Sequence, residues 1–169
     1  MKNKSLYIHG LDSKPNQQKI NLINIYSKVY FLHIDYNKQK DTFALLSKLI
    51  DNKNINCIIG SSFGGMLAYW LGKKYNIPSV LFNPAFGKEN FINPFNKNNI
   101  NDPYNLIVLG GKDEIVIPKS VISFIKKSNK KNYELNIIPE MGHRIDLKNF
   151  EKVITLFFKS INHEKNNIH

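Results

Sequence analysis

Residues 55–71 read INCIIGSSFGGMLAYWL and place Ser62 between an apolar run and a second, helix-like apolar stretch. The centre of this segment, Gly60-Ser61-Ser62-Phe63-Gly64, is a G-x-S-x-G pattern in the setting of a buried strand, a sharp turn and a helix. Such a turn is too tight for bulky neighbours, and it lifts the serine hydroxyl above the edge of a sheet. The pattern therefore predicts a nucleophilic serine at position 62.

The rest of the chain alternates between strand-like and helix-like segments. The apolar patterns predict strands over 5–9, 29–34, 55–59, 79–82, 106–109 and 135–138, and helices over 16–26, 41–50, 66–75, 118–127 and 147–161. Strands that are apolar on both faces and separated by helices imply a mostly parallel sheet covered on both sides. We therefore predict an α/β protein with a six-stranded, mostly parallel sheet.

The length of 169 residues suits a single domain spanning 1–169. Residues 83–101 break the alternation, since they hold two prolines, three phenylalanines and several asparagines. A long loop of this kind predicts a small cap over the site, with plain irregular packing as the alternative. The polar tail at 163–169 is expected to fray.

The net charge of +11 raises the question of nucleic-acid binding. The lysines, however, are scattered along the whole chain, Arg144 is the only arginine, and no zinc-finger or glycine-aromatic RNA-binding signature occurs. We expect non-specific affinity for polyanions at low salt and no specific nucleic-acid partner.

Other sequence features bear on the compartment. No apolar run approaches the ~20 residues needed to cross a bilayer, so no membrane partner is expected. The start, Met1-Lys2-Asn3-Lys4, lacks the long apolar region of a signal peptide. The single cysteine, Cys57, excludes an internal disulfide and a zinc cluster, and it lies in a predicted strand as a small core residue. These features favour a cytoplasmic protein.

A serine hydroxyl becomes a good nucleophile when a base takes its proton and a carboxylate orients that base. In a parallel sheet of this kind the partners follow later strands, in the chain order serine, acid, histidine. Asp113 follows the fifth predicted strand and His143 follows the sixth. Both residues fall at the sheet edge that carries Ser62, so the sequence predicts a Ser62–His143–Asp113 triad.

Each residue of this set also has a simpler interpretation. Ser62 could cap the following helix, Asp113 could be a turn residue after two glycines, and His143 could be a surface histidine. Glu114 is a rival acid, although Asp113 is the expected reaching position of the loop. Asp35 is a weaker alternative for the acid, because the predicted first strand lies between it and Ser62.

An oxyanion hole needs two N–H donors aimed at the developing charge. We expect one to be the backbone N–H of Phe63 and the other to come from the loop after the first strand, at Leu11. Gly10 lets that loop pass close to the substrate. We expect His9 to be a structural hydrogen-bonding residue rather than a second base.

Taken together, these motifs resemble the alpha/beta-hydrolase superfamily and, more narrowly, the small bacterial YqiA-like esterases. The resemblance rests on 7–16 (YIHGLDSKPN), 60–65 (GSSFGG), 83–85 (NPA), 111–114 (GKDE) and 142–144 (GHR). It implies a three-layer alpha/beta-hydrolase core that lacks the first strands of larger members, with esterase activity toward short acyl chains. It also implies Ser62 as nucleophile, Asp113 as acid and His143 as base. Phe63 and Met141 depart from the usual leucine and glycine, which could reshape the pocket.

The sequence thus predicts a carboxylesterase-type serine hydrolase (EC 3.1.1 class) that cleaves short or medium acyl esters through an acyl-enzyme. The expected partner is a small-molecule acyl ester; no metal or organic cofactor is required, and no signal for an oligomeric state is present. A thioesterase or small-amide hydrolase would use the same residues, and a non-catalytic binding module could share the fold. Activity is expected to fall at acid pH as His143 protonates.

Overall fold

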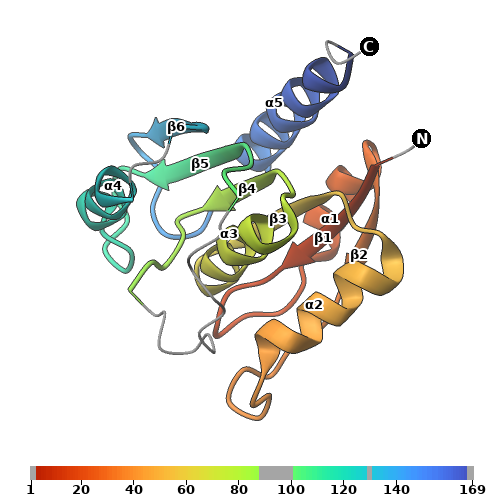
Figure 1. The fold of residues 1–169 in the computed structure, drawn as a ribbon. Helices are drawn as coiled ribbons and strands as arrows, with labels where there is room; N and C mark the ends of the chain where they lie inside the picture. The colour runs from red at the N-terminus through yellow and green to blue at the C-terminus, as the bar shows by residue number, and fades with distance from the viewer. Residues whose placement is uncertain (1–2, 88–100, 129–130, 167–169) are drawn as a thin grey trace.

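The computed structural model of the protein describes residues 3–87, 101–128 and 131–166. Within these ranges lie six strands and five helices, and a helix follows every strand except β4, after which β5 is the next described element (Figure 1). The strands are β1 (Asn3–Ile8), β2 (Ser27–Phe31), β3 (Cys57–Ser61), β4 (Ser79–Phe82), β5 (Asn105–Gly110) and β6 (Tyr133–Ile138). The helices are α1 (Gln17–Asn24), α2 (Thr42–Lys53), α3 (Phe63–Tyr75), α4 (Pro118–Lys127) and α5 (Leu147–Asn166).

The strands form one sheet in the order β2-β1-β3-β4-β5-β6, and every neighbouring pair is parallel. The predicted six-stranded parallel sheet is therefore confirmed. Because all strands run the same way, their carboxyl ends meet at one edge, where open sheets of this type build their sites. β3, which leads to Ser62, lies inside the sheet between β1 and β4.

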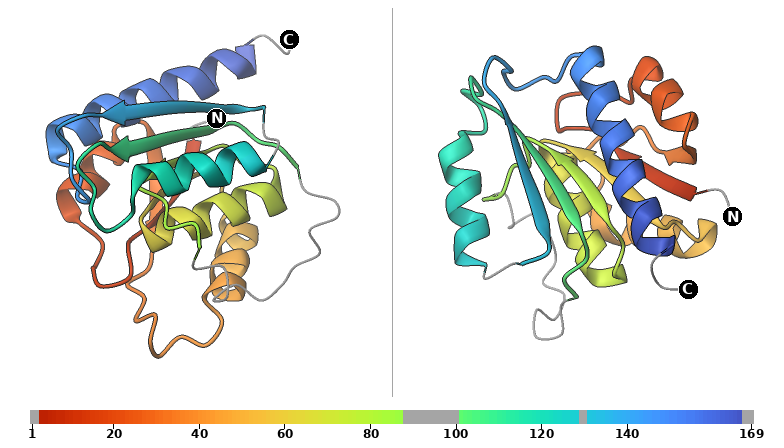
Figure 2. Two further views of the ribbon diagram at one scale, coloured as in Figure 1. Left: turned by 90° about the vertical axis from the view of Figure 1, so that its left-hand side faces the viewer. Right: turned by 90° about the horizontal axis from the view of Figure 1, so that it is seen from above.

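Helices cover both faces of the sheet, which gives three layers (Figure 2). Residues of α2, α3 and α4 pack into one hydrophobic cluster, and residues of α1 and α5 pack into the other. Successive strand residues alternate between these clusters: Ile58 belongs to the first, whereas Cys57 and Ile59 belong to the second. Burial on both faces explains why the strands read as continuous apolar runs. Cys57 is a fully buried core residue, as predicted.

The second strand differs from the prediction of 29–34, since β2 starts at Ser27 and ends at Phe31. At its start the Ser27 hydroxyl lies 2.6 Å from the Ser5 hydroxyl of β1, which pairs two buried polar groups. Beyond its end the Ile34 N–H donates to Nε2 of His9 at 3.0 Å. A side chain thus takes a backbone donor that the sequence pattern would assign to the strand ladder.

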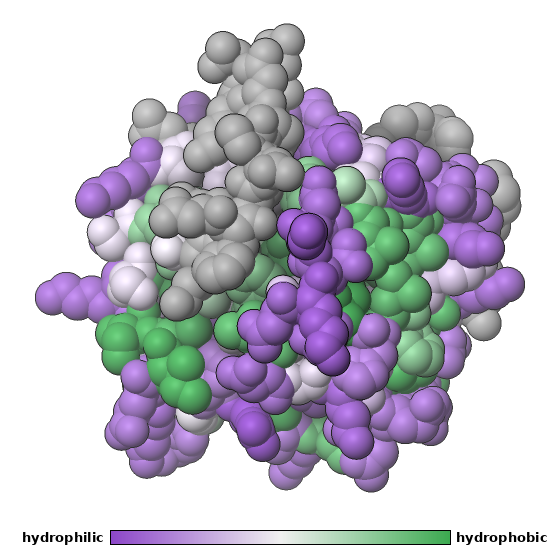
Figure 3. Space-filling view, turned by 90° about the horizontal axis from the view of Figure 1, so that it is seen from below, coloured by the Kyte–Doolittle hydropathy of each residue, from purple (hydrophilic) through white to green (hydrophobic). Residues whose placement is uncertain are grey.

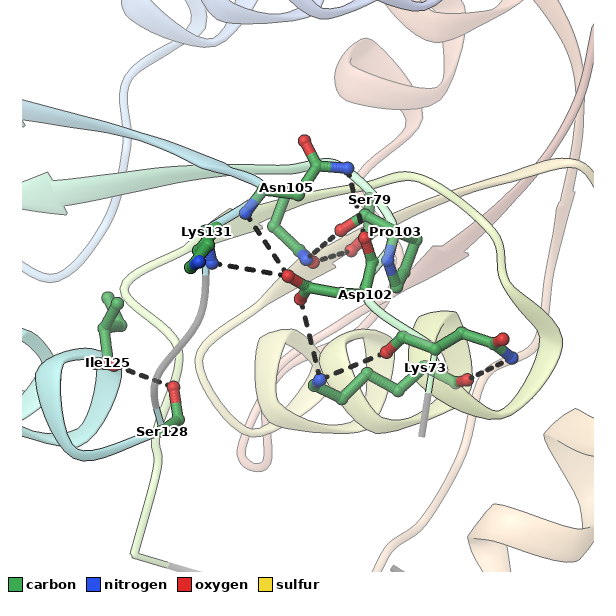
Figure 4. A network of polar contacts seen from close by, with 10 residues as sticks. Lys73, Ser79, Asp102, Pro103, Asn105, Ile125, Ser128 and Lys131 are labelled. Carbon is green, nitrogen blue, oxygen red and sulfur yellow. Dashed lines mark hydrogen bonds and ion pairs between the residues drawn. The ribbon is translucent and has the colours of Figure 1, made fainter. Parts of the chain in front are cut away.

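A polar cluster lies at the end of the sheet where β5 and β6 begin, opposite the end that carries Ser62 (Figure 4). Lys73, near the end of α3, is 1% exposed, and its Nζ donates to the Asn101 carbonyl at 3.3 Å. The same Nζ lies 3.9 Å from the Asp102 carboxylate. Asp102 also accepts the N–H groups of Lys131 and Asn132, each at 3.3 Å. This cluster joins the end of α3 to the segments that precede β5 and β6.

Two sequence predictions concern residues near the limits of the description. Of the predicted cap at 83–101, residues 88–100 lie outside the described part. At the carboxyl end, α5 continues to Asn166, and residues 167–169 lie outside. In the residues that the structure describes, no helix combines the length and apolar character needed to cross a membrane.

Candidate active site

Ser62 stands at a sharp turn between β3 and α3. Its backbone has φ 55° and ψ −119°, in the positive-φ region that side-chain-bearing residues rarely adopt. The turn is fixed by the Ser62 N–H, which donates to the Phe82 carbonyl of β4 at 2.8 Å. The Ser62 side chain makes no capping hydrogen bond to α3, so the helix-cap interpretation is not supported. Its hydroxyl is turned toward a different partner.

The two flanking glycines allow the close approach on which this turn depends. A Cβ on Gly60 would collide with the Gly64 carbonyl oxygen and would lie 2.7 Å from the Cβ of Ala68. A Cβ on Gly64 would collide with the His9 carbonyl oxygen at the end of β1. Any larger residue at either position would push α3 away from the sheet, and Ser62 with it.

A continuous line of hydrogen bonds joins the three predicted residues. Nε2 of His143 lies 3.1 Å from Oγ of Ser62, and Nδ1 lies 2.8 Å from Oδ2 of Asp113. A carboxylate can only accept, so Nδ1 carries the ring proton and Nε2 is left to accept from the serine hydroxyl. The structure thus brings Ser62, His143 and Asp113 together, although they are up to 81 positions apart in the sequence.

Asp113 is held in place on both carboxylate oxygens. While Oδ2 faces His143, Oδ1 accepts the N–H groups of Ile115 at 2.9 Å and Val116 at 2.8 Å. The Asp113 side chain is fully buried, whereas that of His143 is 20% exposed. Asp113 is therefore a turn residue and the histidine's partner at once, and the neighbouring Glu114 points to solvent as an exposed residue.

The predicted spare acid, Asp35, does not join this site. It lies in the loop after β2, where it pairs with Lys38 at 3.2 Å and accepts the Asn37 N–H. The bond from Lys38 is the main cause that lowers the pKa of the Asp35 carboxyl. Its contacts are local and account for it as an exposed turn residue.

The loops that carry the acid and the histidine are bonded directly to each other. The Gly111 N–H donates to the Ile138 carbonyl and the Lys112 N–H to the Met141 carbonyl, both at 2.9 Å. A Cβ on Gly110 would collide with the Gly142 carbonyl oxygen, which shows how closely the two loops pass. The ends of β5 and β6 therefore act as one unit.

The loop after β1 borders Ser62, as the oxyanion-hole prediction requires. A Cβ placed on Gly10 would lie 3.3 Å from the Cβ of Ser62. Leu11, the next residue, is 38% exposed. Phe63, the other predicted donor, is the first residue of α3 and directly follows Ser62. Both predicted N–H groups are thus carried by segments beside the serine.

His9 forms structural hydrogen bonds, in agreement with the expectation for this residue. It is 1% exposed; Nε2 accepts the Ile34 N–H, so the proton must sit on Nδ1, which donates to the Gly10 carbonyl at 2.7 Å. Burial lowers the pKa of His9, while the Gly10 carbonyl opposes the shift and nearby His33 adds to it. The Tyr36 hydroxyl donates to the His9 carbonyl at 2.7 Å, a contact that sequence analysis did not predict.

One further residue contacts the site but was not among the predicted site residues. Asn83 directly follows β4, is 1% exposed and has φ 44°. Its side chain reaches both the Asp113 loop and the His143 loop. An asparagine directly after a buried strand, where the chain must turn, is the available sequence signal, because asparagine tolerates positive φ better than most residues.

Among residues 3–87, 101–128 and 131–166, no group of three His, Cys, Asp or Glu side chains is arranged to hold a metal ion. The candidate site holds a serine hydroxyl, an imidazole and a carboxylate within hydrogen-bond distance of one another.

The parallel sheet, its helix layers and the turn at Ser62 define the alpha/beta-hydrolase fold. The sequence matches the family UPF0227, described as an uncharacterised protein family, over residues 4–138. The chain therefore belongs to this family, and the resemblance noted from the sequence motifs is confirmed. No curated protein matches the sequence.

Solved structures with the same fold match nearly the whole chain. MGS-MChE2, an alpha/beta hydrolase enzyme from a lagoon-sediment metagenome, superposes with a TM-score of 0.70 at 15% identity and covers 98% of this chain and 93% of its own. Est1E from Butyrivibrio proteoclasticus gives 0.67 at 18%, with 97% and 88% covered. Esterase PE8 gives 0.63 at 14%, with 92% and 91% covered. At these identities the likeness shows the fold.

Proposed function

We propose that the protein is a serine hydrolase that cleaves carboxylic esters of short or medium acyl chains through an acyl-enzyme. The observation that carries this proposal is the line from the buried Asp113 carboxylate through His143 to the Ser62 hydroxyl. Nucleophile, base and orienting acid lie within hydrogen-bond distance in that order, which is the arrangement that activates a serine. Similarity to the fold of esterases adds weight.

The mechanism follows from the protonation pattern. Nε2 of His143 takes the hydroxyl proton as Oγ of Ser62 attacks the ester carbonyl, and Asp113 stabilises the imidazolium that forms. The N–H groups of Phe63 and Leu11 stabilise the oxyanion. His143 then gives the proton to the leaving alcohol. Water, activated by the same imidazole, attacks the acyl-enzyme and releases the acid.

The surroundings of the site favour an apolar acyl group. Ile115 and Ile117, in the loop that follows Asp113, are 73% and 50% exposed, and Leu11 on the opposite loop is 38% exposed. Figure 3 shows a hydrophobic area at its lower left, on the side where Figure 1 places α4 and the loop before it. Exposed apolar side chains on the two loops that adjoin the triad suit a substrate with an apolar acyl chain.

Covalent labelling with a fluorophosphonate tests the proposal. The wild-type protein is expected to be labelled at one residue, and Ser62→Ala is expected to lose the label. Ser61→Ala is the matched control, since Ser61 is the adjacent serine and ends β3; it should label like the wild type. Equal labelling of wild type and Ser62→Ala would remove Ser62 from the mechanism. Absence of labelling in all three would favour a non-catalytic binding module.

Substrate profiling then separates the reaction classes. Among p-nitrophenyl esters, hydrolysis should be fastest for short or medium acyl chains. Thioesters and anilides with an acyl chain of equal length should be hydrolysed more slowly than the ester. A rate that increases steadily to long fatty chains would contradict the chain-length preference. A clear preference for the thioester or the anilide would assign the same three residues to a thioesterase or an amide hydrolase.

A further inference from the structure

We propose that Asn83 is a positioning residue, which holds the acid and histidine loops in register with Ser62. The inference rests on the proposed serine-hydrolase function and adds to it a fourth residue that touches no substrate. Asn83 directly follows β4, which lies between β3, the strand that leads to the serine, and β5, the strand that leads to the acid. No motif of the triad includes it.

The Asn83 amide contacts both loops with all of its hydrogen-bonding groups. Oδ1 accepts the Gly110 N–H at 2.7 Å, at the start of the loop that leads to Asp113. Nδ2 donates to the carbonyl of His143 at 2.9 Å and to the carbonyl of Gly142 at 3.2 Å. The backbone carbonyl of the histidine itself is therefore tied to this side chain.

These partners leave one orientation for the amide. The Gly110 N–H can only donate and the two carbonyls can only accept, so oxygen faces β5 and nitrogen faces the histidine loop. An aspartate of the same size would place a carboxylate against two carbonyl oxygens. The backbone φ of 44° adds a second requirement, since asparagine is among the few side-chain-bearing residues that tolerate it. Both requirements select asparagine at position 83.

The residues beside Asn83 hold the serine. The Phe82 carbonyl accepts the Ser62 N–H at 2.8 Å, and the Ala85 N–H donates to the Ser62 carbonyl at 3.0 Å. Asn83 itself is fixed by its backbone N–H, which donates to the Val108 carbonyl at 2.8 Å. Residues 82–85 are thus hydrogen-bonded to the serine turn, the acid loop and the histidine loop together.

This arrangement predicts that loss of the Asn83 side chain acts on catalysis more than on substrate binding. The Ser62–His143 distance of 3.1 Å depends on where the His143 backbone lies, and the carbonyls of His143 and Gly142 would both lose their donor. Misplacement of a catalytic group by about 1 Å can lower a rate roughly 100-fold. The hydrogen bonds of the Asn83 side chain do not involve Leu11 or Ile115, whose exposed side chains lie on loops that adjoin the triad. Substrate binding should therefore change little.

Two variants and one control test this proposal. Asn83→Gly removes every side-chain contact and keeps a residue that accepts the positive φ, so backbone strain does not contribute. Asn83→Asp keeps the acceptor for Gly110 and loses both donors. The control is Asn105→Ala: Asn105 is also buried, accepts from the Ser79 hydroxyl and donates to the Pro103 carbonyl, both at 2.7 Å (Figure 4). Asn105 begins β5 and lies five residues before Gly110, which ends it at the active-site edge of the sheet. At ~3.3 Å per residue the two residues are about 16 Å apart.

Ester hydrolysis is measured per folded molecule, with the folded fraction taken from thermal unfolding, which corrects for any unfolded fraction. We expect both Asn83 variants to lose roughly 10- to 100-fold in kcat with KM little changed. We also expect the downfield proton NMR signal of the His143 Nδ1–H, bonded to Asp113, to broaden or move upfield. Asn105→Ala should keep the wild-type kcat and this NMR signal, even if its melting temperature falls as far as those of the Asn83 variants. Should Asn83→Gly fail to fold, Asn83→Asp decides by the same criteria.

The proposal is overturned if the Asn83 variants keep wild-type kcat and the downfield signal. It is equally overturned if Asn83 and Asn105 variants lose activity in parallel with melting temperature, since Asn83 would then be an ordinary core residue. Failure of the proposed function gives a different result. In that case the wild type itself does not react with the fluorophosphonate, while the NMR signal still reports whether Asn83 positions His143 against Asp113.

Discussion

Asp113→Asn gives the sharpest test of how the site works, because the structure dictates how the new amide must lie. Oδ1 of residue 113 accepts two N–H groups, from Ile115 and Val116. The asparagine oxygen must take that place, since an NH2 group there would face two donors. The NH2 group is then turned toward Nδ1 of His143, where the carboxylate oxygen lies now at 2.8 Å.

The consequence is a change of tautomer. With a donor opposite it, Nδ1 becomes the acceptor and the ring proton moves to Nε2, so His143 offers an N–H to Ser62 and can no longer take the hydroxyl proton. The same substitution in a Ser-His-Asp triad lowers kcat about 10,000-fold. That factor corresponds to about 5 kcal/mol of barrier, at about 1.36 kcal/mol per factor of ten. Stability should change little, because both N–H groups keep their acceptor.

The assay is kcat/KM on p-nitrophenyl acetate together with thermal unfolding. Glu114→Gln is the matched control, since it makes the same chemical change at the adjacent, exposed carboxylate. We expect Asp113→Asn to lose nearly all activity at an unchanged melting temperature, and Glu114→Gln to retain it. Activity of Asp113→Asn within about tenfold of wild type would refute the tautomer argument. An equal loss in Glu114→Gln would identify Glu114 as the acid.

Three further substitutions test the packing and the ionisation of the surroundings. Gly64→Ala should destabilise the protein by about 1–3 kcal/mol, because its Cβ would meet backbone carbonyl groups, whereas Gly142→Ala, whose Cβ has only one contact at 3.8 Å, should be tolerated in thermal unfolding. Burial lowers the pKa of His9 below its ordinary 6.5, so in acid the unfolded chain binds a proton that the folded chain does not. The free energy of unfolding, measured with urea, should therefore fall as the pH decreases below about 6.5. His9→Asn should reduce that pH dependence. Lys73→Met should lower the melting temperature, since it leaves the Asn101 carbonyl without this donor and Asp102 without its cation.

The sequence was sufficient to predict the fold and to place the candidate site residues after neighbouring strands. Buried strands, such as β4 at Ser79–Phe82, carry a nearly pure apolar signal, and the prediction for this strand matches its observed bounds. The helix that begins with Pro118 was also predicted with its observed ends, because proline marks a first helical turn. Ser62, Asp113 and His143 each follow a strand, so parallel topology alone places them at one edge.

Contacts between distant side chains could not be predicted in the same way. The end of β2 depends on His9, which takes the N–H of Ile34 from another part of the chain. In the sequence Asn83 was the first residue of the predicted cap at 83–101 and of the 83–85 (NPA) motif. Its contacts with Gly110 and His143 arise only when three strands are placed side by side. Local patterns describe what a segment prefers, whereas these bonds depend on which segments become neighbours.

The backbone at Ser62 also implies a conflict between durability and reactivity. A side-chain-bearing residue held at φ 55° costs of order 1–3 kcal/mol, a penalty that glycine avoids. Ser62→Gly should therefore be inactive and yet melt at a higher temperature than the wild type, and a lower melting temperature would show that the turn is relaxed. The strained backbone at Ser62 thus lowers the stability of the fold, and the same backbone conformation lifts the hydroxyl above the sheet.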